Sequence, residues 1–295
     1  METADILAKI RKIEITTCNL VSELFSGEYH SLFKGQGLEF SEVREYQSGD
    51  SYRQIDWNVS ARMGAPYIKK FEETRELNVL FLVDASASTL FGTRSMLKSE
   101  YITEVTAVLS FSALSNNDKV GLLLFTDEIE CYIPPRKGRK NALRMLRDIL
   151  YFEPQHHGTD LRKAIEYTYR LTRKRSIVFV ISDFADDGWQ HSLRLLARKH
   201  DVVALRVIDA AETELPNAGL LHVRDPETGA TLTVNSGSRA VRERYATLAA
   251  EREQSLQRSF KQARIDLVTL RTDQSYTKEL MRFFKLRLRR KNRTS

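Results

Sequence analysis

Short runs of β-branched and aliphatic residues alternate with longer segments of helical periodicity from Leu77 onward, and this alternation limits the fold more than any other feature. It is typical of a parallel β-sheet wrapped by helices, because each parallel strand needs a long crossover before the next one begins. The predicted strands cover residues 78–84, 119–126, 128–133, 176–182, 201–208 and 265–271. The predicted helices cover, at about these bounds, residues 94–115, 139–150, 160–173, 189–199, 239–263 and 275–290. The sequence therefore predicts an α/β fold with a doubly wound, mostly parallel sheet flanked by helices.

Two segments depart from the regular alternation. In residues 119–133 two strands follow each other too closely for a helical crossover, so we expect the second, short strand to return antiparallel at an edge of the sheet. Residues 220–234 predict an additional hairpin, because the DPETG sequence at 225–229 supplies turn-forming residues between two apolar runs. We expect this hairpin to be an insertion in the α/β domain.

The region before Leu77 divides into a helix and a polar stretch. One stripe of side chains recurs at alternating steps of four and three, which predicts an N-terminal helix that packs on the core of the chain. The stripe comprises Ile6, Ile10, Ile13, Thr17, Leu20 and Leu24. The stretch after Gly27 is rich in glycine, arginine, acids and aromatics. We therefore expect residues 1–76 to form an N-terminal helix and extension, and residues 77–295 to form the α/β domain.

Polar residues follow two of the predicted strands, where ligands bind in doubly wound sheets. Asp84, Ser86 and Ser88 end the first strand, and Asp183 ends the strand at 176–182. Thr159 lies between them in a loop that opens a helix. These five residues are the candidate site, and their two carboxylates and three hydroxyls suit Mg²⁺ or Mn²⁺ better than zinc or copper.

This arrangement resembles the metal-ion-dependent adhesion site of von Willebrand factor A domains. The resemblance implies that Ser86, Ser88 and Thr159 ligate the ion through their hydroxyls. It implies that Asp84 and Asp183 act directly or through water, and that a partner protein fills an open position with a carboxylate. Neutral ligands leave the ion attractive to an incoming Asp or Glu.

The extension carries a second resemblance. The motifs GQGLEF (35–40), VREY (43–46), GD (49–50), RQIDW (53–57) and SAR (60–62) are similar to the signature of the bacterial domain of unknown function 58 family. The similarity continues to DPETG at 225–229 and RFF at 282–284. Members commonly carry a von Willebrand factor A-like domain and are similar to partners of MoxR-type AAA+ ATPases, in systems with chaperone roles. The resemblance therefore implies a MoxR-type AAA+ ATPase as a partner.

Arginines and acids alternate along the signature stretch. The set comprises Arg44, Arg53 and Arg62 with Glu39, Glu45, Asp50 and Asp56. Such a pattern can form a buried or half-buried ion network, and buried pairs more often fix geometry than add stability. Two interpretations stay open: the stretch clamps against the α/β domain, or it forms a direct partner surface.

Composition excludes several classes of protein. The longest apolar runs, 79–83 and 177–181, are far shorter than the roughly 18 to 20 residues of a membrane-spanning helix. The N-terminus has no uninterrupted apolar core typical of a secretory signal, so we expect a cytoplasmic protein. Cys18 and Cys131 are far apart and have no metal-like spacing, so they predict neither a disulfide framework nor a zinc site.

The formal net charge of +7 is concentrated at the C-terminus. Seven basic residues and no acid lie between Arg282 and the end of the chain, so the rest of the chain is formally neutral. This distribution argues against a broad nucleic-acid-binding face. The tail is either a solvated helix end or a contact for an anionic partner.

Catalysis is the competing interpretation. Asp84 could serve a metal-dependent hydrolase or phosphotransferase, but a haloacid-dehalogenase-type enzyme needs a second aspartate where Ser86 stands. No serine-hydrolase elbow, zinc-protease motif or phosphate-binding loop is present in the sequence. We therefore expect a non-enzymatic, metal-dependent protein–protein interaction module that acts as an adaptor or co-chaperone. The alternatives are the Asp84-dependent enzyme and a nucleic-acid adaptor that uses the basic tail.

Overall fold

A six-stranded sheet forms the centre of the computed structural model, which describes residues 3–21, 38–47, 49–73, 76–93, 96–156, 158–225 and 229–294. Its strands are β3 (Asn78–Asp84), β4 (Lys119–Phe125), β5 (Ile129–Arg136), β6 (Ile177–Ser182), β7 (Asp201–Ile208) and β10 (Asp266–Arg271). Their spatial order is β10-β7-β6-β3-β4-β5. All neighbours pair in parallel except β4 and β5. The predicted α/β fold class and the antiparallel edge strand are both confirmed.

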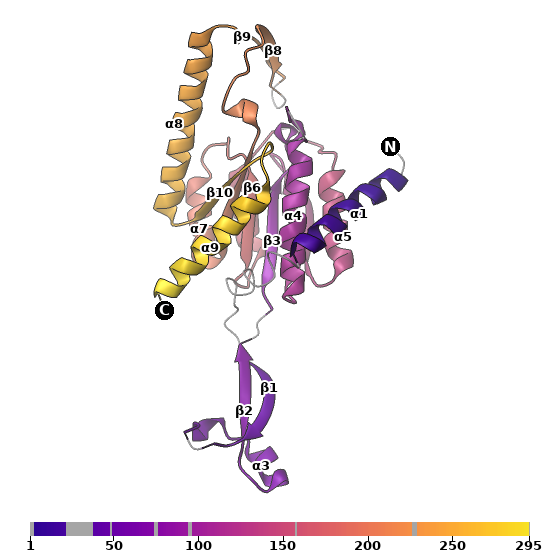
Figure 1. Cartoon of the computed structure of the whole chain (residues 1–295), viewed down its shortest axis with the longest axis vertical. Coiled ribbons are helices and arrows are strands. Elements are labelled where there is room, and N and C mark those ends of the chain that lie inside the picture. Colours follow the sequence, from indigo (N-terminus) through magenta and orange to yellow (C-terminus); the bar gives the residue numbers. More distant parts are fainter. Residues whose placement is uncertain are drawn as a thin grey trace.

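Helices cover both faces of this sheet (Figure 1). One face packs against α1 (Thr3–Leu20), α4 (Lys98–Ser115), α5 (Arg139–Leu150) and α9 (Tyr276–Thr294). The other face packs against α6 (Leu161–Leu171), α7 (Gln190–Lys199) and α8 (Arg239–Ala263). The central strands are apolar throughout because both of their faces are buried, which accounts for the continuous hydrophobic runs in the sequence.

Successive residues of a strand point to opposite faces of the sheet and pack in two separate hydrophobic cores, one on each face. Phe81 of β3 faces the first core and stacks on Phe179 of β6, with ring centroids 5.4 Å apart. Leu82, the next residue of β3, faces the second core. Two buried layers thus fix the register of the sheet, because a slip of one residue would exchange the two faces.

The N-terminal helix packs on the sheet domain as predicted. Ile10 and Ile13 of α1 are buried, and Ile13 belongs to the first core. Glu14 of α1 is also buried and forms an ion pair with Arg139 of α5. Of the predicted stripe, Leu24 lies outside the described residues.

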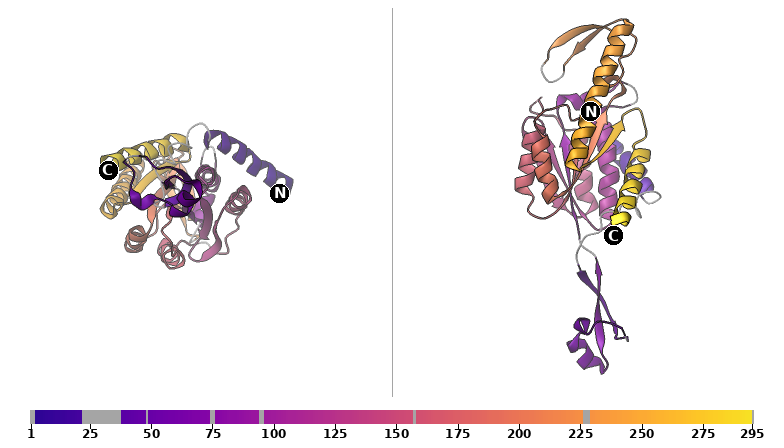
Figure 2. Two further views of the ribbon diagram at one scale, coloured as in Figure 1. Left: turned by 90° about the horizontal axis from the view of Figure 1, so that it is seen from below. Right: turned by 90° about the vertical axis from the view of Figure 1, so that its left-hand side faces the viewer.

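An antiparallel hairpin forms the extension. It consists of β1 (Leu38–Glu45) and β2 (Tyr67–Glu73), with the 3-10 turn η2 (Tyr52–Gln54) and the short helix α3 (Trp57–Met63) between them. Asp56 caps α3 by accepting hydrogen bonds from the backbone N–H groups of Asn58 (3.0 Å) and Val59 (3.3 Å). Figures 1 and 2 show the hairpin pointing away from the six-stranded sheet. The extension is therefore not clamped against the sheet domain in this structure.

The described part of the extension holds one ion pair of the predicted network. Arg44 pairs with Asp50 at 2.7 Å, but Arg53 and Arg62 are exposed. Arg53 lies on η2 and Arg62 on α3, in the segment between the two strands of the hairpin. The motif at 35–37 lies outside the described residues.

A second hairpin, β8 (Leu220–Arg224) with β9 (Thr231–Asn235), confirms the predicted hairpin. It follows the 3-10 turn η4 (Ala210–Glu212), which comes directly after β7. The hairpin and the first half of α8 extend beyond the sheet (Figure 1). The buried residues of α8 are Leu256 and Phe260, which both lie in its second half.

The C-terminal helix α9 is anchored by Leu280 and Phe284, which are fully buried. Two arginines of the basic tail pair with acids of the sheet domain: Arg287 contacts Asp201 and Asp266, and Arg290 contacts Asp266 at 2.9 Å. Part of the tail's charge is therefore satisfied within the chain. No helix in the described part of the chain is both long and apolar enough to cross a membrane.

Candidate metal centre

The carboxyl edge of the sheet, where β3, β4, β6 and β7 end, carries the predicted site. Asp84 is the last residue of β3 and only 2% exposed. Its Oδ1 accepts a hydrogen bond from the backbone N–H of Ser86 (3.0 Å), and its Oδ2 accepts one from the Ser182 hydroxyl (2.8 Å). The first bond closes a local turn that aspartate favours where a chain leaves a strand. The second bond joins the ends of β3 and β6.

Ser86 and Ser88 begin the 3-10 turn η3 (Ala87–Leu90) that follows β3. Ser86 is fully buried, and its Oγ lies 3.0 Å from the Oγ of Ser88. Ligands at neighbouring corners of an octahedral Mg²⁺ site also lie about 3.0 Å apart, since each metal–oxygen bond is about 2.1 Å long. The two hydroxyls share a hydrogen bond at this separation, and the same separation matches two adjacent coordination positions.

Asp183 follows β6 and lies near Asp84. Its Oδ1 accepts a hydrogen bond from the backbone N–H of Ala185 (3.0 Å). Burial raises the pKa of Asp84 to about 6, and the negative charge of Asp183 adds to this rise. Two carboxylates are thus crowded at this edge, which is an arrangement that a cation relieves.

Thr159 reaches the same edge one strand away. Its loop is fixed by Asp160, whose backbone N–H donates to the carbonyl of Thr126 at the end of β4 (2.9 Å). The Asp160 side chain then caps α6 by accepting from the backbone N–H of Lys163 (2.7 Å). Because β4 neighbours β3, Thr159 shares the edge with Asp84. The assignment of all five residues to one metal site remains a prediction.

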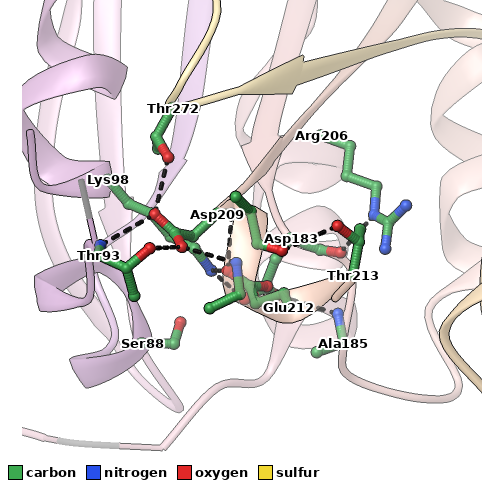
Figure 3. A network of polar contacts seen from close by, with 12 residues as sticks. Ser88, Thr93, Lys98, Asp183, Ala185, Arg206, Asp209, Glu212, Thr213 and Thr272 are labelled. Carbon is green, nitrogen blue, oxygen red and sulfur yellow. Dashed lines mark hydrogen bonds and ion pairs between the residues drawn. The ribbon is translucent and has the colours of Figure 1, made fainter. Parts of the chain in front are cut away.

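A lysine that the sequence analysis did not single out lies at the same edge. Lys98 begins α4, is 3% exposed, and places its Nζ 3.2 Å from Asp183 and 2.6 Å from Glu212 (Figure 3). Burial by itself lowers the pKa of Lys98, but the charges of both carboxylates outweigh it and hold that pKa above its ordinary value. A lysine at the start of a helix is common, so no sequence pattern marked it.

Asp209 fastens the surrounding loops together (Figure 3). It is buried after β7 and accepts hydrogen bonds from the backbone N–H of Thr93 (3.1 Å), that of Ala211 (2.9 Å) and the hydroxyl of Thr272 (2.8 Å). Burial raises the pKa of Asp209, but these hydrogen bonds outweigh it and the pKa lies below its ordinary value. The Asp209 carboxylate therefore holds together the loops that carry Thr93, Ala211 and Thr272.

Arg206 links the edge to α8. Its Nε donates to the carbonyl of Asp183 (3.2 Å), and its guanidinium pairs with Glu253 of α8. Glu253 lies in the second half of α8, which packs on the sheet domain, so Arg206 joins that half of α8 to the loop that holds Asp183.

The donor chemistry of the edge favours a hard cation. In the described part of the chain, no group of three or more His, Cys, Asp or Glu residues could hold a metal ion. A site here therefore needs the serine and threonine hydroxyls as ligands. Oxygen donors of this kind suit Mg²⁺ or Mn²⁺.

Comparison with known proteins places this chain in a family. The model described as "Protein of unknown function DUF58" matches residues 42–255, which include most of the β1–β2 hairpin and all five candidate site residues. The chain belongs to the DUF58 family. The resemblance predicted from the signature motifs is thus confirmed.

Two relatives are described only as uncharacterized proteins. An "Uncharacterized protein Rv1480" from Mycobacterium tuberculosis (strain ATCC 25618 / H37Rv) is 31% identical over 285 residues, which cover 96% of this chain and 90% of that protein. An "Uncharacterized protein YeaD" from Bacillus subtilis (strain 168) is 33% identical over 107 residues, which cover 36% of this chain and 25% of that protein.

Among solved structures, the conserved hypothetical protein BatB from Bacteroides thetaiotaomicron matches with a TM-score of 0.46 and 18% identity, over 72% of this chain and 99% of that one. The SpRpn10 VWA domain matches with a TM-score of 0.33 and 13% identity, over 45% of this chain and 76% of that one.

Proposed function

We propose that this chain is a non-catalytic protein–protein interaction module that captures a carboxylate of its partner through a divalent cation at the carboxyl edge of the sheet. The observation that carries the proposal is the 3.0 Å separation of the Ser86 and Ser88 hydroxyls beside the buried carboxylate of Asp84. The two serine hydroxyls are neutral ligands and do not offset the charge of a bound cation. The positive charge that remains attracts an acidic partner.

The roles of the residues follow from their contacts. Ser86, Ser88 and Thr159 would hold Mg²⁺ or Mn²⁺ through their hydroxyls, and Asp84 and Asp183 would act directly or through water. When bound, the ion supplies a Lewis-acidic position for the partner's carboxylate. The Ser182 hydroxyl and the Ser86 backbone N–H keep the Asp84 carboxylate oriented toward the edge.

Apolar side chains around the edge support a protein partner. Leu90, Phe91 and Leu97 are exposed large hydrophobic residues on the segment that follows the site. A pocket beside Asp84 adds further apolar lining, including Ile149 and Phe152. Apolar groups around a polar anchor are typical of a protein–protein interface.

The family resemblance favours a MoxR-type AAA+ ATPase as the partner, with this chain as its adaptor or co-chaperone. The cytoplasm is the compartment that this role predicts. Catalysis by Asp84 is disfavoured because Ser86 stands where a haloacid-dehalogenase-type enzyme needs its second aspartate.

Titration calorimetry with Mn²⁺ or Mg²⁺ tests the site. Asp84→Ala should abolish binding, while Asp201→Asn should not change it, because Asp201 begins β7 at the opposite edge of the sheet. A pull-down with a MoxR-type ATPase, with and without EDTA, tests the partner. Unchanged metal binding in Asp84→Ala, or capture of the ATPase that ignores EDTA, would contradict the proposal.

A further inference from the structure

The buried ammonium of Lys98 is the most unusual group at the carboxyl edge. A buried lysine requires negative partners, and Lys98 has two of them, Asp183 and Glu212. One of these partners is a residue of the proposed metal site. The chain therefore places its own fixed cation beside the position of a divalent cation.

The contacts of Glu212 keep this cation in place. The same Glu212 oxygen that meets Lys98 also accepts a hydrogen bond from the backbone N–H of Asp209 (2.9 Å). Asp209 in turn holds Thr93 and Thr272. Lys98 thus lies between Asp183 and a Glu212 carboxylate that Asp209 holds in place, so its charge is part of the edge.

Both carboxylate oxygens of Asp183 already have partners within the chain. Its Oδ2 pairs with Lys98 (3.2 Å) and its Oδ1 accepts from Ala185 (3.0 Å). The negative charge of Asp183 is thus already offset by the positive charge of Lys98. A second cation nearby is repelled by that charge.

We propose that Lys98 is an internal counter-ion that weakens divalent-cation binding in the absence of a partner and makes the binding of cation and partner carboxylate mutually dependent. This inference rests on the proposed function. An incoming carboxylate adds the negative charge that Lys98 has offset, so the cation binds more tightly once the partner is present. By thermodynamic reciprocity, the cation tightens partner binding by the same factor.

Lys98→Gln removes the charge and keeps a polar side chain of similar length. Mn²⁺ titration by calorimetry should show at least ten-fold tighter binding to Lys98→Gln than to the unmodified chain. Arg287→Gln is the matched control, because Arg287 also bridges two acids, Asp201 and Asp266, but at the opposite edge of the sheet. Its Mn²⁺ affinity should equal that of the unmodified chain.

A second pair of variants covers the case in which Lys98→Gln does not fold. Glu212→Gln alone is compared with the double variant Lys98→Gln/Glu212→Gln. Lys98→Gln leaves both Asp183 and Glu212 without their lysine, whereas the double variant leaves only Asp183. The double variant should bind Mn²⁺ at least ten-fold more tightly than the single one. Far-UV circular dichroism reports whether each variant is folded.

Acetate serves as a probe for the partner's carboxylate. It should tighten Mn²⁺ binding to the unmodified chain more than to Lys98→Gln, after correction for the acetate complex of free Mn²⁺. If the unmodified chain binds Mn²⁺ and removal of Lys98 leaves the affinity unchanged or weaker, this inference is wrong while the metal site stands. If no variant binds Mn²⁺, both the metal site and this inference are wrong.

Discussion

Replacing Asp84 by asparagine should stabilise the metal-free protein and remove its response to Mg²⁺. The raised pKa of Asp84 means that folding disfavours the ionised carboxylate, so this group's contribution to stability is lost as the pH rises from about 4 to about 6. A rise from 3.8 to about 6 corresponds to a penalty of about 3 kcal/mol at neutral pH.

Asparagine removes this penalty but keeps only one acceptor oxygen. Either the Ser86 N–H or the Ser182 hydroxyl then loses its present bond, at a cost of about 1 kcal/mol. The expected net effect is a gain of about 1 to 2 kcal/mol in the free energy of unfolding of the metal-free protein.

Urea unfolding at pH 7.5, followed by the fluorescence of the buried Trp189, measures this change in EDTA and again in Mg²⁺. The unmodified protein should gain stability from Mg²⁺, because a ligand that binds only the folded state stabilises it. Asp84→Asn should not. A variant that is less stable than the unmodified chain in EDTA, or that still gains stability from Mg²⁺, would refute the reasoning.

Two further predictions concern residues away from the site. Burial and the charges of Lys199 and Arg175 lower the pKa of His200 to about 4, so its contribution of up to about 3 kcal/mol should be lost as the pH falls from about 6.5 to about 4. His200→Asn should remove that part of the pH dependence in urea unfolding, and parallel curves for the two proteins would contradict it. Phe284→Ala should cost about 3 to 5 kcal/mol in the same assay because the ring is fully buried. The exposed Leu286→Ala on the same helix should cost no more than about 0.5 kcal/mol, and equal losses would contradict the packing of α9.

Much of the fold was predictable from local pattern. Runs such as 79–83 and 177–181 are apolar without alternation, which already indicates strands buried on both faces. The short separation of the segments that became β4 and β5 was enough to predict an antiparallel edge. The turn residues at 225–229 were enough to predict the β8–β9 hairpin.

The sequence also placed Asp84 and Asp183 at one edge, because parallel strands end on the same side. Their hydrogen bonds could not be predicted in this way. The bond from Ser182 to Asp84 requires β6 to lie directly beside β3, although β4 follows β3 in the chain. Strand order is a property of the whole sheet, not of any segment.

By itself, the sequence determined the strands and helices of the sheet domain, the fold class and the edge that carries the candidate site, since these depend on local periodicity and strand direction. It did not predict the β1–β2 hairpin of the extension. Only the tertiary structure decided where the fixed charges lie. Lys98 and Asp183 are 85 positions apart and meet because α4 begins, and β6 ends, at the same edge. Arg53 and Arg62, which alternate with acids in the sequence, remain exposed because their hairpin points away from the sheet. An ion pair leaves no periodic trace in the chain, so its presence or absence depends on the packing of distant segments.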